Sequence, residues 1–296
     1  MKALLITIRT CDNSDFYNKK LSIMPEVKLK IIQIILLFLF LVCSSDFAIA
    51  GPPYDTDDPV PVDFRCWELY LSSHSSYSRT FAQGTLPHLE VNYGVLNNVQ
   101  LHLIAPLAFN NEYAGKSNFG IGDIEAGVKF RFIRETKYSP QIGIFPLCEI
   151  LTGNSARELG NGKTQFLLPV WIQKSFGDKW QTYGGFGYWI NPGNGNTNWS
   201  YLGWQVQYQL IKNVSIGAEI NHYTPDTKEG KSDSRFNIGS VIDLNSQNHL
   251  LISVGRSFNN NILLQCYVGY LFTISNKALS EVSSHLFNRK NMASYL

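Results

Sequence analysis

Acid-base and nucleophilic catalysis use histidine, glutamate and serine side chains, and six such residues lie near one another in the chain. They are His74, His88, His102, Glu68, Glu90 and Ser72. A Ser-His-acid site is defined by its geometry and not by sequence position, so these residues alone leave catalysis open. The simpler interpretation places them as hydrated side chains on the polar faces of three β-strands. We favour this interpretation and expect no enzymatic activity.

Two short motifs could bind an ion or a phosphate. Asp55, Asp57 and Asp58 lie together in GPPYDTDDPVPVDF, and calcium takes several carboxylate ligands. The proline-rich setting more simply predicts an extended, solvated segment. GNGKT at 160–164 is similar to the end of a phosphate-binding loop, but Arg157 replaces the first glycine and no helix follows. A flexible loop is the favoured interpretation, and we expect no metal or organic cofactor.

Charges of both signs share one face of GIGDIEAGVKFRF, residues 120–132. They are Asp123, Glu125, Lys129 and Arg131. Such a wall could contact a substrate, or its ion pairs could simply brace a narrow barrel, which is the interpretation we favour. In either case the face points away from lipid, because Lys or Arg facing the bilayer centre costs about 2–4 kcal/mol.

The elements that position these residues are strands. About twelve stretches alternate between apolar and polar residues and are separated by turn residues. Most are longer than the five or six residues usual in soluble proteins and match the nine to eleven that cross a bilayer. The stretches are 65–77, 86–94, 98–109, 120–134, 139–151, 164–176, 179–191, 199–211, 213–223, 235–245, 248–257 and 262–272.

Each stretch has an apolar and a polar face. Aromatic residues such as Trp67, Trp204 and Tyr270 on the apolar faces fit the interfacial girdles of a membrane barrel. Polar side chains could not be buried in an apolar core without partners, so they predict a wet lumen. The candidate lumen-lining residues are Glu68, Glu90, Gln100, His102, Asp123, Glu125, Lys129, Arg131, Glu149, Gln205, Gln207, Gln209 and Glu219.

Five apolar residues interrupt the polar faces. They are Phe145, Leu147, Leu167, Trp171 and Tyr201. They could form an apolar stripe for a ligand, or they could plug the lumen. The pattern alone does not decide between the two.

The predicted fold is all-β. In lipid every backbone polar group must be paired, so the sheet must close. Connections alternate between short and long, as in barrels with short periplasmic turns and longer outer loops. We therefore predict a transmembrane antiparallel up-and-down β-barrel of about 12 strands over residues 65–272. Residues 51–64 would form an extended segment at the barrel mouth, and residues 273–296 a C-terminal tail.

The first fifty residues predict export. The apolar run 31–42 is too short to span a bilayer. Lys28 and Lys30 precede it and Ala48-Ile49-Ala50 follows it, which indicates a signal peptide over residues 1–50 cut after Ala50. The true start is then possibly Met24, because a signal from there has ordinary length. Lipidation at Cys43 is the less favoured alternative.

Composition excludes other classes. A net charge of +2 gives no strong positive electrostatic field that would attract nucleic acid. Charged residues make up 16% of the chain, well below the quarter usual in soluble domains. Cys66, Cys148 and Cys266 are too widely spaced for a disulfide framework or a zinc site, so we expect them to act as small hydrophobes.

Several blocks together resemble a known family. GPPYDTDDPVPV, TLPHLEVNYGV, GIGDIEAGVKFRF, the GNGKTQF segment and YGGFGYWINPGNGNTNW occur in the order found in the MetA-pathway of phenol degradation family. The resemblance covers about residues 51–272 and implies a Gram-negative outer-membrane transporter for hydrophobic or aromatic compounds. Tyr267, Gly269 and Phe272 also resemble the closing-strand signal of barrels inserted by the barrel-assembly machinery.

The expected function is a monomeric outer-membrane channel for small, hydrophobic or aromatic solutes, with membrane lipid and the assembly machinery as partners. Two alternatives remain: a lipid-acting outer-membrane enzyme and a closed structural barrel. An enzyme of that kind needs its nucleophile on the lipid-facing wall, whereas the strand pattern puts His74 and His102 inside. A soluble exported β protein is a third alternative.

Overall fold

The computed structural model describes residues 51–275. The predicted signal peptide and residues 276–296 of the predicted tail lie outside the described residues. Within the described range the chain is all β, apart from a single 3-10 turn at Ser155–Arg157. No helix in residues 51–275 has the length and apolar character needed to cross a membrane.

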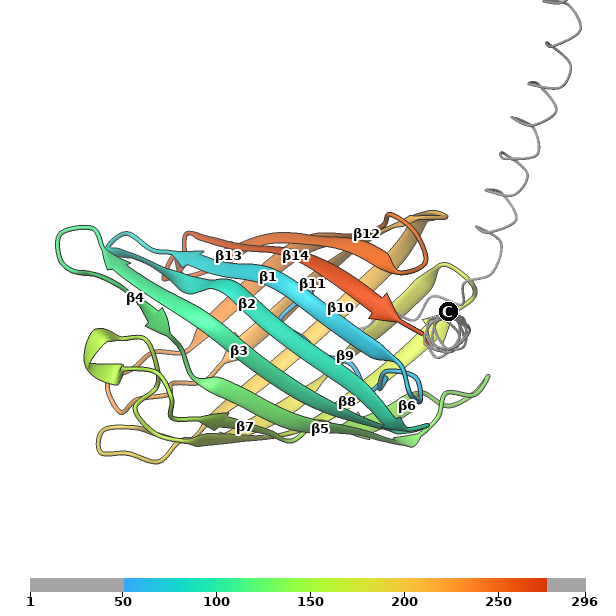
Figure 1. The fold of residues 1–296 in the computed structure, drawn as a ribbon, viewed down its shortest axis with the longest axis horizontal. Helices are drawn as coiled ribbons and strands as arrows, with labels where there is room; N and C mark the ends of the chain where they lie inside the picture. The colour runs from blue at the N-terminus through green and yellow to red at the C-terminus, as the bar shows by residue number, and fades with distance from the viewer. Residues whose placement is uncertain (1–50, 276–296) are drawn as a thin grey trace, which may run out of the picture. The chain divides into compact units, whose positions relative to one another are not determined.

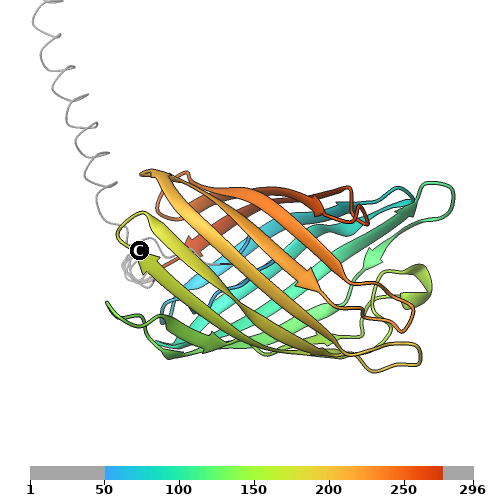
Figure 2. The same ribbon diagram turned by 180° about the vertical axis from the view of Figure 1, so that it is seen from behind.

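The strands form one antiparallel sheet in which most strands pair with the next strand in sequence, and β1 pairs with β14 to close it (Figures 1 and 2). The strands are β1 Trp67–Tyr77, β2 Phe81–Leu96, β3 Val99–Glu112, β4 Ser117–Ile121, β5 Ile124–Ile133, β6 Gln141–Ile144, β7 Leu147–Ile150, β8 Gln165–Phe176, β9 Trp180–Ile190, β10 Trp199–Ile211, β11 Val214–Tyr223, β12 Asp233–Asp243, β13 Asn248–Ser257 and β14 Leu264–Ile274.

Two of the barrel strands are interrupted. Both β4 and β5 pair with β3, and both β6 and β7 pair with β5 and β8. Each pair therefore makes one staggered strand of the wall, and the closed barrel has twelve strands. The predicted fold class is confirmed.

The interruptions have local causes. Pro146 has no N–H to donate to the ladder, so the predicted stretch 139–151 divides at Phe145-Pro146. The stretch 120–134 divides at Gly122-Asp123, where the Asp123 carboxylate accepts backbone N–H groups from the loop after β7. The sequence pattern predicted both stretches as continuous.

The two faces of each strand differ as the pattern predicts. On β10, Leu202, Trp204 and Val206 point outward and are exposed, while Tyr201 and Gln205 point inward and are buried. Because a strand alternates its side chains with period two, this places the apolar face on the outside of the barrel. The outer surface is therefore the one that suits lipid.

The two ends of the barrel also differ (Figure 1). One end, here the turn end, carries the short connections such as 97–98 and 212–213, together with the start of β1 and the end of β14. The other, the loop end, carries the longer connections, including 151–164, 191–198 and 224–232. This arrangement is the one found in outer-membrane barrels, whose outer loops are the longer ones.

Candidate functional site

The candidate site is the interior of the barrel. Six predicted lumen residues line one internal cavity of about 150 Å³: Glu68, Glu90, Gln100, His102, Glu125 and Lys129. Gln205 and Glu219 are fully buried in the interior. Arg131, Gln207 and Gln209 lie nearer the turn end, where they bond Gln141, Ser215 and the Ile211 carbonyl oxygen. Asp123 and Glu149 lie nearer the loop end and contact the loop after β7.

The interior is occupied by the chain that precedes β1. Residues 51–66, here called the inner segment, enter the lumen, and Thr56 and Asp58 are 0% exposed. The blue trace of this segment is visible between the strands in Figure 1. The sequence predicted a solvated segment at the mouth, and the structure corrects this. Its partners lie about 40 to 210 residues away in sequence, so no local pattern reveals them.

Glu219 of β11 holds the turn of the inner segment. Its two carboxylate oxygens accept the backbone N–H groups of Asp55 at 2.9 Å and Thr56 at 2.8 Å. The Asn237 side chain donates to the same carboxylate. The Thr56 hydroxyl also bonds the Tyr201 hydroxyl at 2.7 Å. A buried carboxylate is stable here because it accepts several hydrogen bonds.

Asp55 links the inner segment to three strands of the barrel wall. Its carboxylate accepts hydrogen bonds from the Tyr223 hydroxyl at 2.9 Å and from the Gln265 amide at 2.8 and 2.9 Å. Asn221 donates at 3.3 Å, and His74 lies 3.7 Å away. Strands β1, β11 and β14 therefore meet through one side chain of the inner segment.

Lys129 of β5 binds the next part of the segment. Its ammonium lies 2.8 Å from the Asp57 carboxylate and 3.7 Å from that of Asp58, and it is itself buried. Asp58 is completely buried, and the Lys129 ammonium is the cation that offsets the cost of burying its carboxylate. The Lys129 ammonium also lies 4.9 Å from the centre of the Phe145 ring.

The segment then returns to the turn end. The Val62 N–H donates to the Gln100 side chain at 2.8 Å, and Arg65 donates from its backbone to Gly94 at 2.7 Å. Phe64 and Gly94 form a bridge between the segment and β2. The inner segment therefore makes its deepest contacts around Asp55 and leaves the lumen by the turn end.

Three cavities follow one another along the lumen. The 150 Å³ cavity beside the inner segment shares Glu90, Glu125 and Phe145 with a second cavity of about 380 Å³. The second cavity shares Trp199 and Tyr223 with a third, of about 550 Å³, at the loop end. The smallest of the three is the cavity beside the inner segment, at about 150 Å³. The lumen is thus constricted by the inner segment.

Aromatic rings line the middle cavity. Trp189 stacks on Trp199 with centroids 5.1 Å apart, and Trp199 contacts Tyr223 at 6.1 Å. Tyr223 then contacts Tyr201 at 5.1 Å, and Tyr201 contacts Trp171 at 6.0 Å. We call these five rings the aromatic wall. Phe145 is buried against Trp171 and Tyr201, and Leu147 packs on this cluster. The predicted interior positions of Phe145, Trp171 and Tyr201 are therefore observed, and they surround a cavity.

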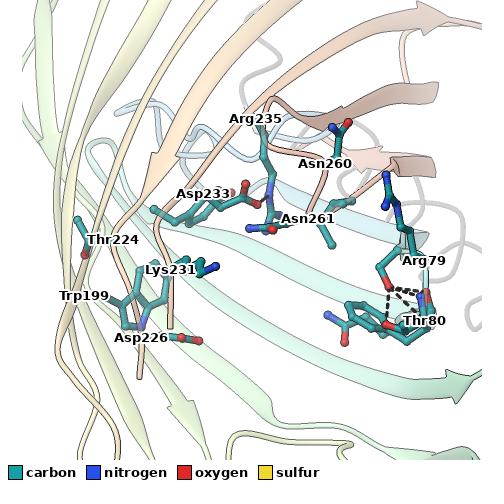
Figure 3. Close-up of a pocket in the computed structure, with 15 residues that line it drawn as sticks. Arg79, Thr80, Trp199, Thr224, Asp226, Lys231, Asp233, Arg235, Asn260 and Asn261 are labelled. Carbon is teal, nitrogen blue, oxygen red and sulfur yellow. Dashed lines mark hydrogen bonds and ion pairs between the residues drawn. The ribbon is translucent and has the colours of Figure 1, made fainter. Parts of the chain in front are cut away.

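The cavity at the loop end is a polar vestibule (Figure 3). Trp199, Asp226 and Lys231 lie on one side of it in Figure 3 and Arg79 on the other. Arg235 is held by Asp233 at 2.7 Å, and its guanidinium carbon lies 4.7 Å from the centre of the Tyr223 ring. The vestibule opens toward the aromatic wall because Trp199 and Tyr223 line both cavities.

Asp123 organises the loop between β7 and β8. It accepts the backbone N–H groups of Thr152 at 3.0 Å, Gly153 at 2.8 Å and Asn161 at 2.6 Å. A Cβ at Gly160 would lie 2.6 Å from the Asp123 carboxylate, so a larger residue there would force the carboxylate to shift. This contact gives Asp123 and Gly160 structural roles in holding the loop.

The catalytic interpretation gains no support from the predicted histidines. His74 bonds Gln265, His88 bonds Thr85, and His102 bonds Asn92 and Glu125. The Ser72 hydroxyl lies 3.4 Å from a backbone carbonyl oxygen.

A serine-histidine contact occurs elsewhere, between β11 and β12. His222 Nδ1 lies 2.7 Å from the Ser234 hydroxyl, on the outward phase near the loop end. The sequence did not single out this pair, because the two residues come together only across the ladder.

Apolar packing inside the barrel was also not predicted. Tyr70, Val241, Leu251, Tyr267 and Leu271 form a buried cluster between β1, β12, β13 and β14. Their strand phase is a signal that could have found them, since Leu251 and Leu271 alternate with outward residues. Packed apolar side chains therefore fill the part of the lumen that lies between these strands.

Similar folds occur among solved structures. The COG4313 outer membrane channel from Pseudomonas putida F1 matches with a TM-score of 0.62 and 13% identity, covering 77% of this chain and 100% of that one. The KdgM porin matches at 0.49 and 11% identity, over 70% and 99% of the two chains. The CymD monoaromatic hydrocarbon channel matches at 0.38 and 8% identity, over 72% and 89%.

No protein-family model matches the sequence, and no curated protein matches it. At these identities the structural likeness concerns the fold alone. The chain has the closed β-barrel fold of outer-membrane channel proteins.

Proposed function

We propose that this protein is an outer-membrane channel for small solutes that carry an apolar or aromatic part. The observation that supports this most directly is the series of three cavities, with shared lining residues, inside a closed barrel with an apolar exterior. The aromatic wall in the middle cavity supports the proposed solute class. The MetA-pathway resemblance of the sequence points the same way.

The inner segment sets the resting permeability. The cavity beside the segment, at about 150 Å³, is smaller than the roughly 300–1,000 Å³ of small-molecule sites, so we expect larger solutes to require the segment to shift. Hydrogen bonds and an ion pair hold the segment against the barrel wall. Such contacts can be exchanged for contacts with water, which makes the segment a displaceable constriction.

Single-channel recording of the purified, heat-modifiable protein in a planar bilayer tests the proposal. We expect small, stepwise conductance for the native protein. Aromatic solutes added on one side should reduce this current in a concentration-dependent way. A folded protein that never conducts would instead support the closed structural barrel, in which the inner segment is a permanent plug.

Export and insertion complete the proposal. We infer that the signal peptide is removed after Ala50 and that the assembly machinery recognises β14, which carries Tyr267, Gly269 and Phe272. The protein then acts as a monomer in the outer membrane of a Gram-negative cell. Amino-terminal sequencing of protein from the outer-membrane fraction tests the cleavage site, and a start at Gly51 is the expected result.

We propose no enzymatic role. A lipid hydrolase would need a nucleophile and base at the lipid-facing wall, and His222 with Ser234 is a pair of those types in that position. A hydrolytic site also needs a group that orients the base and donors for an oxyanion. Phospholipid release by the purified protein, compared with its Ser234→Ala variant, tests this alternative.

A further inference from the structure

The middle cavity combines two chemical features that bind one class of solute. Its aromatic wall presents Trp171, Trp189, Trp199, Tyr201 and Tyr223. Its other lining groups include the carboxylates of Asp55, Asp57, Glu90 and Glu125. A ring face carries negative charge density, so rings and carboxylates both attract a cation.

Two cations of the protein lie against aromatic rings that line the middle cavity. The Arg235 guanidinium lies over the Tyr223 ring, with 4.7 Å between its carbon and the ring centroid. The Lys129 ammonium lies 4.9 Å from the Phe145 centroid. Both distances are within the roughly 6 Å at which a cation is attracted to a ring face. Between these two cations, the cavity is bordered by Tyr201 and Trp171.

The carboxylates of the cavity are not matched by cations in it. Among the described residues, the basic side chains that line the cavity are His74 and His88. Asp55 is bonded mainly by neutral donors, namely Tyr223, Gln265 and Asn221. Lys129 compensates Asp57 from outside this cavity, and His102 lies beside Glu90 and Glu125. The cavity therefore has a surplus of negative charge.

We propose that the middle cavity binds a small organic cation, such as an alkylated ammonium group, between the aromatic wall and these carboxylates. An alkylated ammonium donates few or no hydrogen bonds, so ring faces and carboxylates are the groups that recognise it. The volume of about 380 Å³ lies in the range of small-molecule sites. This inference narrows the class of solute that the channel takes. The passage of the bound cation through the barrel rests on the proposed function.

Calorimetric titration of the detergent-purified, heat-modifiable protein tests the binding without requiring conduction. Choline is the probe, and 3,3-dimethylbutan-1-ol is its uncharged isostere. We expect choline to bind at least tenfold more tightly than the alcohol, because only the cation interacts with ring faces and carboxylates. Trp171→Leu should weaken choline binding roughly tenfold, whereas Trp171→Phe, which keeps a ring, should weaken it less.

Trp204→Leu is the matched control, because Trp204 is on the outer wall and 49% exposed. It should bind choline as the native protein does. The proposal is overturned if the alcohol binds as well as choline, if neither binds at about 10 mM, or if both tryptophan-to-leucine variants lose binding equally. A protein that binds choline but never conducts would refute the channel and leave this site standing. A conducting protein without choline binding would refute the site alone.

Discussion

The Glu219→Gln variant should release the inner segment without disturbing the barrel. In the native structure the carboxylate accepts two backbone N–H groups of the segment, at 2.9 and 2.8 Å. A glutamine keeps one acceptor oxygen and turns an amide donor toward the other N–H. One hydrogen bond to a charged group is therefore lost, which costs about 1.5–3 kcal/mol.

This loss predicts the size of the functional effect. At 1.4 kcal/mol per factor of ten, the displaced state of the segment should become roughly 10- to 150-fold more populated. The assay is single-channel recording, in which the fraction of time spent at a larger conductance level reports the displaced state. We expect this fraction to rise by that factor in the variant.

Glu149→Gln is the matched control for loss of an inward-facing carboxylate. Glu149 accepts a hydrogen bond from the Asn161 side chain at 2.7 Å, in the loop after β7 and not in the inner segment. The Glu149→Gln variant should change the unit conductance slightly and leave the larger conductance level as rare as in the native protein. If the two variants behave alike, with folding verified by the gel shift, Glu219 does not hold a gate and the reasoning fails.

Three further substitutions have expected outcomes. Lys129→Met leaves the carboxylates of Asp57 and Asp58 without their cation, so the free energy of unfolding should fall by about 3–5 kcal/mol. Denaturant unfolding measures this, and an unchanged transition midpoint would contradict the described ion pairs. Asp123→Ala removes the acceptor of three loop N–H groups, so protease should cut the loop 151–163 while the barrel stays heat-modifiable; equal resistance would contradict the clamp. Ser234→Ala should leave phospholipid release unchanged at background, and any activity that depends on Ser234 and His222 would revive the enzyme alternative.

The barrel was predictable because its strands obey a strict local rule. The predicted stretches 199–211 and 248–257 coincide with β10 and β13, since outward side chains recur with period two along most of each strand. The twelve-strand count followed from the same rule. The interruptions at Asp123 and Pro146 were not predicted, because they depend on a loop contact and on one missing ladder donor.

The site was predictable only in part. Phase alone placed residues such as Gln205 and Trp171 inside the barrel. It could not predict what meets them there, because Asp55 and Glu219 are 164 residues apart in sequence. The aspartates of the inner segment resembled a solvated run for the same reason. Their partners, Glu219, Lys129 and Gln265, become neighbours only when the barrel closes.

The most direct test of the account compares the conductance of the native protein with that of a variant lacking residues 53–62, the part of the inner segment that lies deepest in the lumen. Both proteins are first shown to be folded by the heat-modifiable gel shift. We expect small, stepwise conductance for the native channel and larger, steady conductance for the variant. Silence from both folded proteins would show that no path runs through this barrel and would contradict the proposal that it is a channel.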